Sequence, residues 1–134
     1  MRGDLTWGVI EKDLQGLARR LEATSQNIVN MNTPKYVRKE VSFEDQLKEI
    51  INAPMRLPMK RSDPRHFSNV KTDISEVAPV DRQVGYEVYR LDLNNVDPET
   101  ETARLAETRM MYQAMTRALS RKISMYRRAI GGGA

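Results

Sequence analysis

The chain has 134 residues, a length that favours a single domain. It contains no Cys, which excludes disulfides, thiol nucleophiles and zinc sites built from Cys and His, and its one His leaves no His-based triad or paired-imidazole site beyond what His66 alone could supply. Basic residues outnumber acidic ones by 22 to 18, for a net charge of +4, and no apolar run is long enough for a transmembrane segment or a cleavable secretory signal.

The first predicted element is a helix over approximately residues 4–31, with Asp4 as its N-cap. Apolar or small side chains recur in steps of three and four, which is typical of a helix that packs along another helix. Gly8 and Gly16 each cost about 1 kcal/mol relative to Ala and indicate either close packing or a helix that stays soft until partners dock. Asn30 and Pro34 bracket the predicted end of the helix. The predicted packing residues are Ile10, Leu14, Leu17 and Leu21.

The middle of the chain, residues 33–96, is predicted to be extended and partly disordered, because prolines interrupt it repeatedly. A short helix is expected near residues 43–52, with Ser42 as its N-cap. The stretch from Arg56 to Lys71 carries five basic residues and one acidic residue, and is either a solvated loop or a contact for an acidic neighbour. Two-residue alternation near residues 86–93 predicts a strand, alone or in a hairpin.

The last predicted element is a long helix within residues 97–134. Asp97 is its expected N-cap, Pro98 occupies the first helical position, and Glu99 and Glu101 are favourable near its positive end. Cations gather in the last turns, where the helix dipole favours them. The predicted packing residues are Leu105, Tyr112, Met115, Leu119, Ile123, Tyr126 and Ile130, with Tyr112 and Tyr126 expected in the core.

These elements predict a mainly α protein. Residues 1–32 and 97–134 are expected to pair antiparallel as a coiled-coil-like hairpin and to form one helical domain, with residues 33–96 as an excursion. A chain with eight Met and two Phe assembles a large core of its own only with difficulty, so it is expected either to be a thin helical hairpin or to complete its core with partners. Glycine-rich phosphate loops, convergent carboxylates and metal-ligand spacings are absent from the sequence, so we expect no enzyme, cofactor site or metal site.

Two motifs at opposite ends of the chain resemble the bacterial flagellar axial proteins, which include rod, hook and hook-associated proteins. In that family a first helix ends in the pattern Asn-Ile-x-Asn-x-Asn-Thr-Pro-Gly-Tyr. Here Lys35 replaces the Gly, so we expect a type I turn, since a type II turn requires a positive φ at that position. The length resembles that of the smallest rod members. The matching residues are Asn27, Ile28, Asn30, Asn32, Thr33, Pro34 and Tyr36 at the first motif and Asn94, Asn95, Val96 and Asp97 at the second.

The resemblance implies a structural subunit of the proximal flagellar rod. Members of the family build a tubular, torque-transmitting shaft by laying their terminal helices beside those of neighbours. The implied partners are further copies, other rod proteins, the membrane-embedded basal ring with its rod-ring adaptor proteins, and the flagellar type III export apparatus. The implied location is the periplasmic rod of the basal body, reached without a cleaved signal peptide.

Two other functions remain open from the residues alone. The basic last helix permits a nucleic-acid-binding helical hairpin, although no known reader motif is present. Paired heptads also permit a cytoplasmic coiled-coil adaptor, which would form small closed oligomers. The flagellar interpretation, in contrast, implies no nucleic acid and no transmembrane segment.

Overall fold

A computed structural model describes residues 2–52, 74–85, 91 and 93–131. The elements in chain order are α1 (Arg2–Val29), β1 (Lys39–Ser42), α2 (Glu44–Asn52), the 3₁₀ turn η1 (Ile74–Glu76), β2 (Val80–Gln83) and α3 (Pro98–Ile130). The basic stretch from Arg56 to Lys71 lies outside the described residues. The predicted mainly α architecture with two long terminal helices is confirmed.

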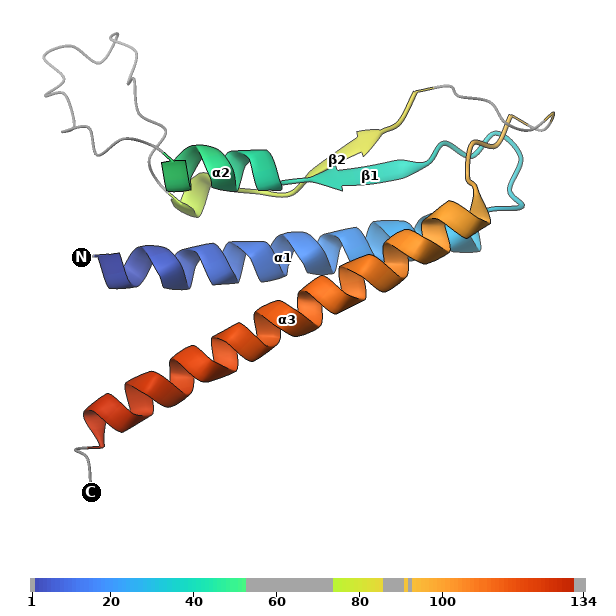
Figure 1. The fold of residues 1–134 in the computed structure, drawn as a ribbon. Helices are drawn as coiled ribbons and strands as arrows, with labels where there is room; N and C mark the ends of the chain where they lie inside the picture. Colours follow the sequence, from blue (N-terminus) through green and yellow to red (C-terminus); the bar gives the residue numbers. More distant parts are fainter. Residues whose placement is uncertain (1, 53–73, 86–90, 92, 132–134) are drawn as a thin grey trace, which may run out of the picture.

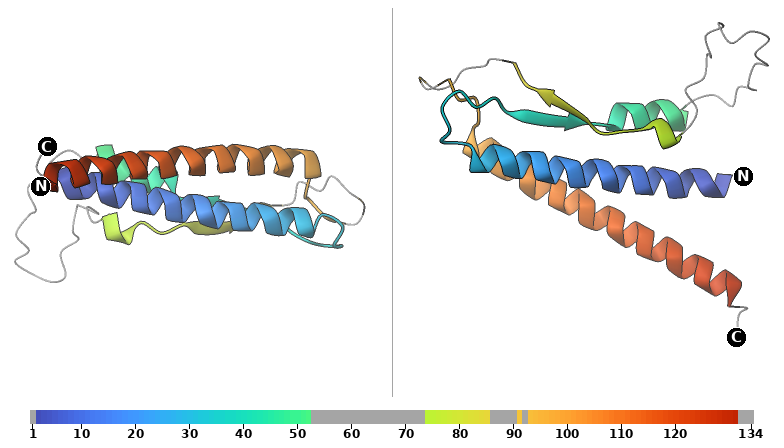
Figure 2. Two further views of the ribbon diagram at one scale, coloured as in Figure 1. Left: turned by 90° about the horizontal axis from the view of Figure 1, so that it is seen from below. Right: turned by 180° about the vertical axis from the view of Figure 1, so that it is seen from behind.

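Helix α1 lies in the middle of the molecule, with α3 on one side and the layer made of α2, η1, β1 and β2 on the other (Figure 1). The two long helices run antiparallel, so both chain ends lie at the same end of the hairpin (Figures 1 and 2). They are close together where α1 ends and α3 begins, and they diverge toward the termini (Figure 1). We call these two regions the closed end and the open end of the hairpin.

Helix α1 begins at Arg2, so Asp4 lies inside the helix and the prediction that it caps the helix is wrong. Its two internal glycines permit close packing against the second layer. A Cβ at Gly16 would lie 2.5 Å from the Phe43 ring, and one at Gly8 would lie 2.9 Å from Ile74 Cγ2. Of the two interpretations of these glycines, the structure supports close packing. The buried core cluster consists of Leu17, Ala23, Val41, Phe43, Leu47 and Val77.

The short helix predicted near residues 43–52 is present as α2, but its predicted N-cap is wrong. Ser42 is the last residue of β1, and α2 begins at Glu44. The strand predicted near residues 86–93 lies mostly outside the described residues, and its two described members adopt a turn at Leu91 and a bend with φ of 61° at Leu93. There the prediction is wrong, because a positive φ is incompatible with a strand.

The strands that do form are β1 and β2, which pair antiparallel with Lys39 opposite Gln83. Side chains of α1 contact β1 as well. The Asn27 amide donates to the Lys39 carbonyl, and the Arg20 guanidinium donates to the Val41 carbonyl at 2.9 Å. These contacts satisfy backbone groups of a short strand that has only one strand neighbour. The position of β1 is therefore set by tertiary partners instead of by local alternation.

Helix α3 starts as predicted, since the Asp97 side chain accepts from the Glu99 N–H and Pro98 occupies the first turn. Its apolar face is less buried than predicted. Tyr112 and Tyr126 are 37% and 42% exposed, so the expectation that both are core residues is wrong. The reason is the divergence of α3 from α1 toward the open end (Figure 1). Of the helices that the structure describes, none is both long and apolar enough to cross a bilayer.

Candidate assembly site

A buried polar cluster joins the two long helices at the closed end. At its centre is Asn27, whose side chain is completely buried. Its amide donates to the Lys39 carbonyl at 2.8 Å and to the Glu101 carboxylate at 2.9 Å. Its oxygen accepts from the Lys39 N–H at 3.0 Å and from the Tyr36 hydroxyl at 3.2 Å. Both donors and both acceptor positions of this amide are thus used inside the protein.

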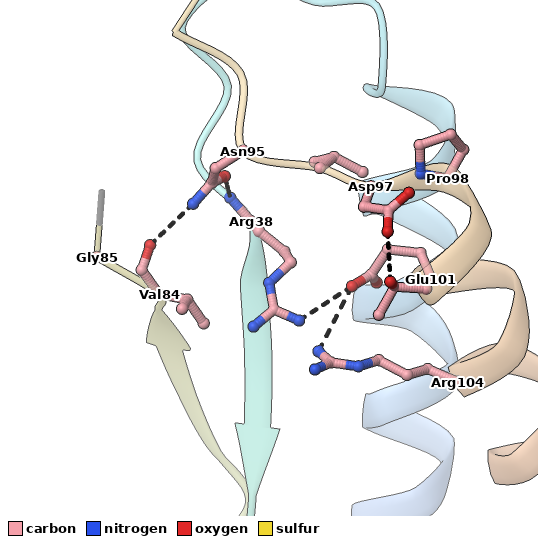
Figure 3. A pocket seen from close by; sticks show the side chains of 10 residues that line it. Arg38, Val84, Gly85, Asn95, Asp97, Pro98, Glu101 and Arg104 are labelled. Carbon is pink, nitrogen blue, oxygen red and sulfur yellow. Dashed lines mark hydrogen bonds and ion pairs between the residues drawn. The ribbon is translucent and has the colours of Figure 1, made fainter. Parts of the chain in front are cut away.

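Glu101 supplies the negative charge of this cluster. The sequence placed it at the positive end of α3 as a dipole partner, yet only 1% of the residue is exposed. Its carboxylate pairs with Arg38 at 3.1 Å and with Arg104 at 3.5 Å (Figure 3). The same carboxylate accepts from Asn27. Burial, and secondly the negative charge of Glu101, raise the pKa of Tyr36. A buried carboxylate needs such partners, because an unpaired charge in the interior is strongly destabilising.

The turn after α1 is held from the other side of the hairpin. The buried Asn94 amide donates to the carbonyls of Asn30, Met31 and Thr33 at 3.0, 3.1 and 2.8 Å. These carbonyls follow Val29, the last residue of α1, and backbone carbonyls outside regular structure require hydrogen-bond partners. The oxygen of the same side chain accepts from the Val96 N–H at 2.8 Å. A single side chain thereby fixes both the turn after α1 and the approach to α3.

The next residue connects the hairpin to the sheet. Asn95 accepts from the Arg38 N–H at 2.7 Å and donates to the Val84 carbonyl at 3.1 Å (Figure 3). Its amide thus bridges the residue that precedes β1 and the residue that follows β2. A cavity of about 410 Å³ lies beside this bridge and is lined by Arg38, Asn95, Glu101 and Arg104 among others. In the described part of the chain, no group of His, Asp and Glu side chains is placed to hold a metal ion.

The turn after α1 differs from the sequence expectation. Lys35 has φ of 61°, the positive value that a type II turn requires and that the Lys was expected to avoid. The Tyr36 N–H donates to the Thr33 carbonyl at 3.3 Å, which closes the turn. Asn94 holds the Thr33 carbonyl and Asn27 holds the Tyr36 hydroxyl. These tertiary contacts fix the backbone and override the conformational preference of Lys35.

The structure brings only part of the first predicted motif together. Asn27 and Tyr36 belong to the cluster, and Asn30 donates to the Gln26 carbonyl and accepts from the Thr33 hydroxyl. Ile28 is half-buried, whereas Asn32, Thr33 and Pro34 are exposed on the turn.

The predicted helix-packing residues fall into three grades of burial. Ile10 and Leu17 are buried, and the half-buried ones are Leu14, Leu21, Leu105, Met115, Leu119 and Ile123. Toward the open end, Tyr126 meets Trp7 only edge-on, with ring centres 6.5 Å apart, and Ile130 is 85% exposed. A groove of about 540 Å³ separates the helices there, lined by Trp7, Glu11, Leu14, Gln15, Ala18, Tyr112 and Leu119. The open end therefore offers apolar surface that this chain does not cover.

Sequence reasoning missed the role of Arg38, the burial of Glu101, and the hydrogen bonds from Asn94 to the turn after α1. Asn94 lies in the C-terminal motif and Glu101 shortly after it, but nothing local assigns them partners more than sixty residues away. The one available signal was the pair of adjacent asparagines shortly before a helix whose cap is already supplied by Asp97.

Comparison with known proteins gives a consistent set of relatives, although no family model matches the chain. The flagellar basal body rod protein FlgB of Bacillus subtilis is 30% identical over 131 residues, covering 94% of this chain and 95% of that protein. FlgB of Borreliella burgdorferi is 33% identical over 106 residues, covering 77% and 78%. FlgB of Escherichia coli K12 is 26% identical over 113 residues, covering 79% and 78%.

Proposed function

Because the chain belongs to the FlgB family of flagellar basal body rod proteins, and is thus a rod component, we propose that it is a structural subunit of the proximal rod. In this proposal its terminal helices pack helically against those of neighbouring subunits. The resulting shaft transmits torque. The role is structural and needs no cofactor.

The observation that supports this proposal is the unfinished packing of α3. Within this helix of 33 residues, only Glu101 and Thr108 are fully buried. Met125 and Ile130 are 65% and 85% exposed. Exposed apolar surface of this kind is characteristic of protein contacts, and contacts between unlike surfaces of identical copies generate open helical assemblies.

The two ends of the hairpin have different roles in this proposal. The residues from Asn27 to Tyr36, held by the polar cluster, fix the relative direction of the helices at the closed end. The apolar faces of α1 and α3 then receive neighbouring subunits at the open end. Residues 1–32 and 97–134 act as one helical domain.

Family membership also leads us to propose a location and partners. We infer that the chain is exported without a cleaved signal peptide by the flagellar type III apparatus and takes its place in the periplasmic part of the rod. Its partners are further copies, other rod proteins, and the membrane-embedded ring with its rod-ring adaptors.

A complementation experiment tests the assembly role. In a strain lacking the gene, the wild-type chain should restore rods and motility, whereas the double variant Tyr126→Asp/Ile130→Asp should leave basal rings without rods in electron cryotomograms. Both positions are exposed, so circular dichroism of the purified variant should remain helical. Gln113→Asp, at another exposed position of α3, is the matched control and should restore rods.

Normal rods with the double variant would contradict the proposal. Small closed oligomers of the purified chain would then favour the adaptor interpretation. Salt-sensitive binding to DNA would favour the nucleic-acid interpretation.

A further inference from the structure

One face of α3 points away from α1 along the whole length of the helix, and we call it the outer stripe. Its members recur every three or four residues, except for the adjacent Ala106 and Glu107, and all of them lie on one side of the helix. All of them are exposed. The outer stripe consists of Glu99, Ala103, Ala106, Glu107, Met110, Ala114, Arg117, Arg121, Met125 and Arg128.

Charge is separated along the outer stripe. Its first part carries the carboxylates of Glu99 and Glu107, and its last part carries the guanidinium groups of Arg117, Arg121 and Arg128. Alanine side chains and Met110 separate these charges along the stripe. Beyond Glu107, α3 contains no acidic residue, so the basic character of this half is unbroken.

The rest of the described chain leaves the outer stripe uncovered. The buried residues of α3, Glu101 and Thr108, lie on the opposite side of the helix. None of the five charged side chains of the outer stripe forms an ion pair with another described residue. The dipole of α3 favours Glu99 in its first turn and Arg128 in its last turn, but it does not account for the charges between them.

We propose that the outer stripe binds the outer stripe of a second copy, with the acidic part of one beside the basic part of the other. This inference rests on the proposed rod function and names the partner and the surface. A parallel arrangement shifted by 18 residues, about 27 Å, places Glu99 opposite Arg117 and Glu107 between Arg121 and Arg128. In a parallel arrangement without the shift, like charges would face each other.

In the shifted arrangement, the two parts of the outer stripe contact two different neighbouring copies. Each copy presents its acidic part to one neighbour and its basic part to the next, so the contact does not close on itself. The small alanine side chains allow the helices to approach closely. Exposed ion pairs are individually weak and are screened by salt, so we expect association that grows with concentration and falls with ionic strength.

Complementary charge reversals test the inference on the full-length chain. Glu99→Lys/Glu107→Lys makes the stripe entirely basic, and Arg117→Glu/Arg121→Glu makes it largely acidic. In sedimentation velocity at low salt, the wild-type chain should form species that grow past the dimer. Each double variant alone should associate at least tenfold more weakly, and an equimolar mixture of the two should associate again.

The matched control is Arg109→Glu/Arg127→Glu, which makes the same charge change on exposed positions of α3 outside the outer stripe. It should associate like the wild type. Circular dichroism should show that all variants remain helical.

Three results would overturn the inference: a mixture that stays monomeric, a control that loses association equally, or a wild-type chain that stops at a closed dimer. Unchanged self-association of Arg117→Glu/Arg121→Glu, together with lost binding to vesicles containing anionic lipid, would instead assign the basic part to a membrane surface. If the stripe variants restore normal rods while Tyr126→Asp/Ile130→Asp does not, this inference fails and the proposed function stands.

Discussion

The two ends of the helical hairpin are built by different means. At the closed end, Asn27, Asn94 and Glu101 are buried, and the structure shows hydrogen-bond partners for each side chain. At the open end, Trp7 and Tyr126 touch edge-on and are 40% and 42% exposed. Directional polar contacts hold one end, whereas apolar surface is left uncovered at the other.

The polar contacts that fix the fold and the apolar surface available for assembly therefore lie at opposite ends of the hairpin. A buried hydrogen-bonded cluster specifies one geometry, because any displacement leaves polar groups without partners. Loosely packed apolar side chains tolerate several arrangements and are suited to receive a neighbour. The hairpin can therefore keep its direction while its far end adjusts to its surroundings.

The largest effect is expected from removing the charge at the centre of the closed end. Glu101→Ala removes the buried carboxylate that pairs with Arg38 and accepts from the Asn27 amide, and should lower the free energy of unfolding by about 3–5 kcal/mol. Tyr126→Ala at the open end should lower it by less than about 1 kcal/mol. Urea unfolding followed by circular dichroism measures both.

Glu99→Ala serves as the matched control, since Glu99 is exposed and lies two residues before Glu101 on the same helix. Its effect should stay below about 1 kcal/mol, because Glu99 contributes a favourable interaction with the helix dipole but no buried contact. Equal losses for Glu101→Ala and Tyr126→Ala would show that the two ends contribute alike, contrary to the structure.

A second test asks how far tight packing extends along α1. Gly16→Ala places a Cβ 2.5 Å from the Phe43 ring and should destabilise the protein by about 1–3 kcal/mol, despite the better helix propensity of Ala. Gly8→Ala would place a Cβ 2.9 Å from Ile74 Cγ2, a less severe overlap than at Gly16, so it should cost less. Thermal melts of the two variants provide the comparison. A stabilised Gly16→Ala variant would mean that α1 does not pack closely there.

The smallest expected effect concerns the backbone at the closed end. Lys35 has a φ of 61°, which is unfavourable for a residue with a Cβ by about 1–2 kcal/mol. Lys35→Gly removes this strain but adds conformational freedom to the unfolded chain, so a net stabilisation of about 0.5 kcal/mol is expected. Lys35→Ala, which keeps the Cβ, is the control and should change the melting temperature little. A destabilised Lys35→Gly would refute a strained turn.

The sequence predicted the features that depend on local chemistry. Asp97 and Pro98 identify the start of α3 because an N-cap and the first helical position act within one turn. The long helical periodicities identify α1 and α3, and a single apolar face identifies α2. None of these features requires knowledge of a distant partner.

The errors have a common physical origin in distant contacts. Glu101 looks like a dipole partner until Asn27 and Arg38 surround it. Lys35 looks incompatible with a positive φ until its neighbours are fixed from across the hairpin. The strand β1 forms where side chains of α1 satisfy its backbone groups, and its own four residues show no alternation of apolar and polar side chains that would predict a strand.

The contact that Asn94 makes with the turn after α1 has a consequence for the order in which the molecule is completed. Its partners are 61 to 64 residues earlier in the chain, so this turn cannot be completed by local folding alone. Closing so long a connection is slow compared with forming a helix. The turn after α1 therefore gains these hydrogen bonds only once a segment synthesised much later is in place, and a chain truncated before that segment would lack them.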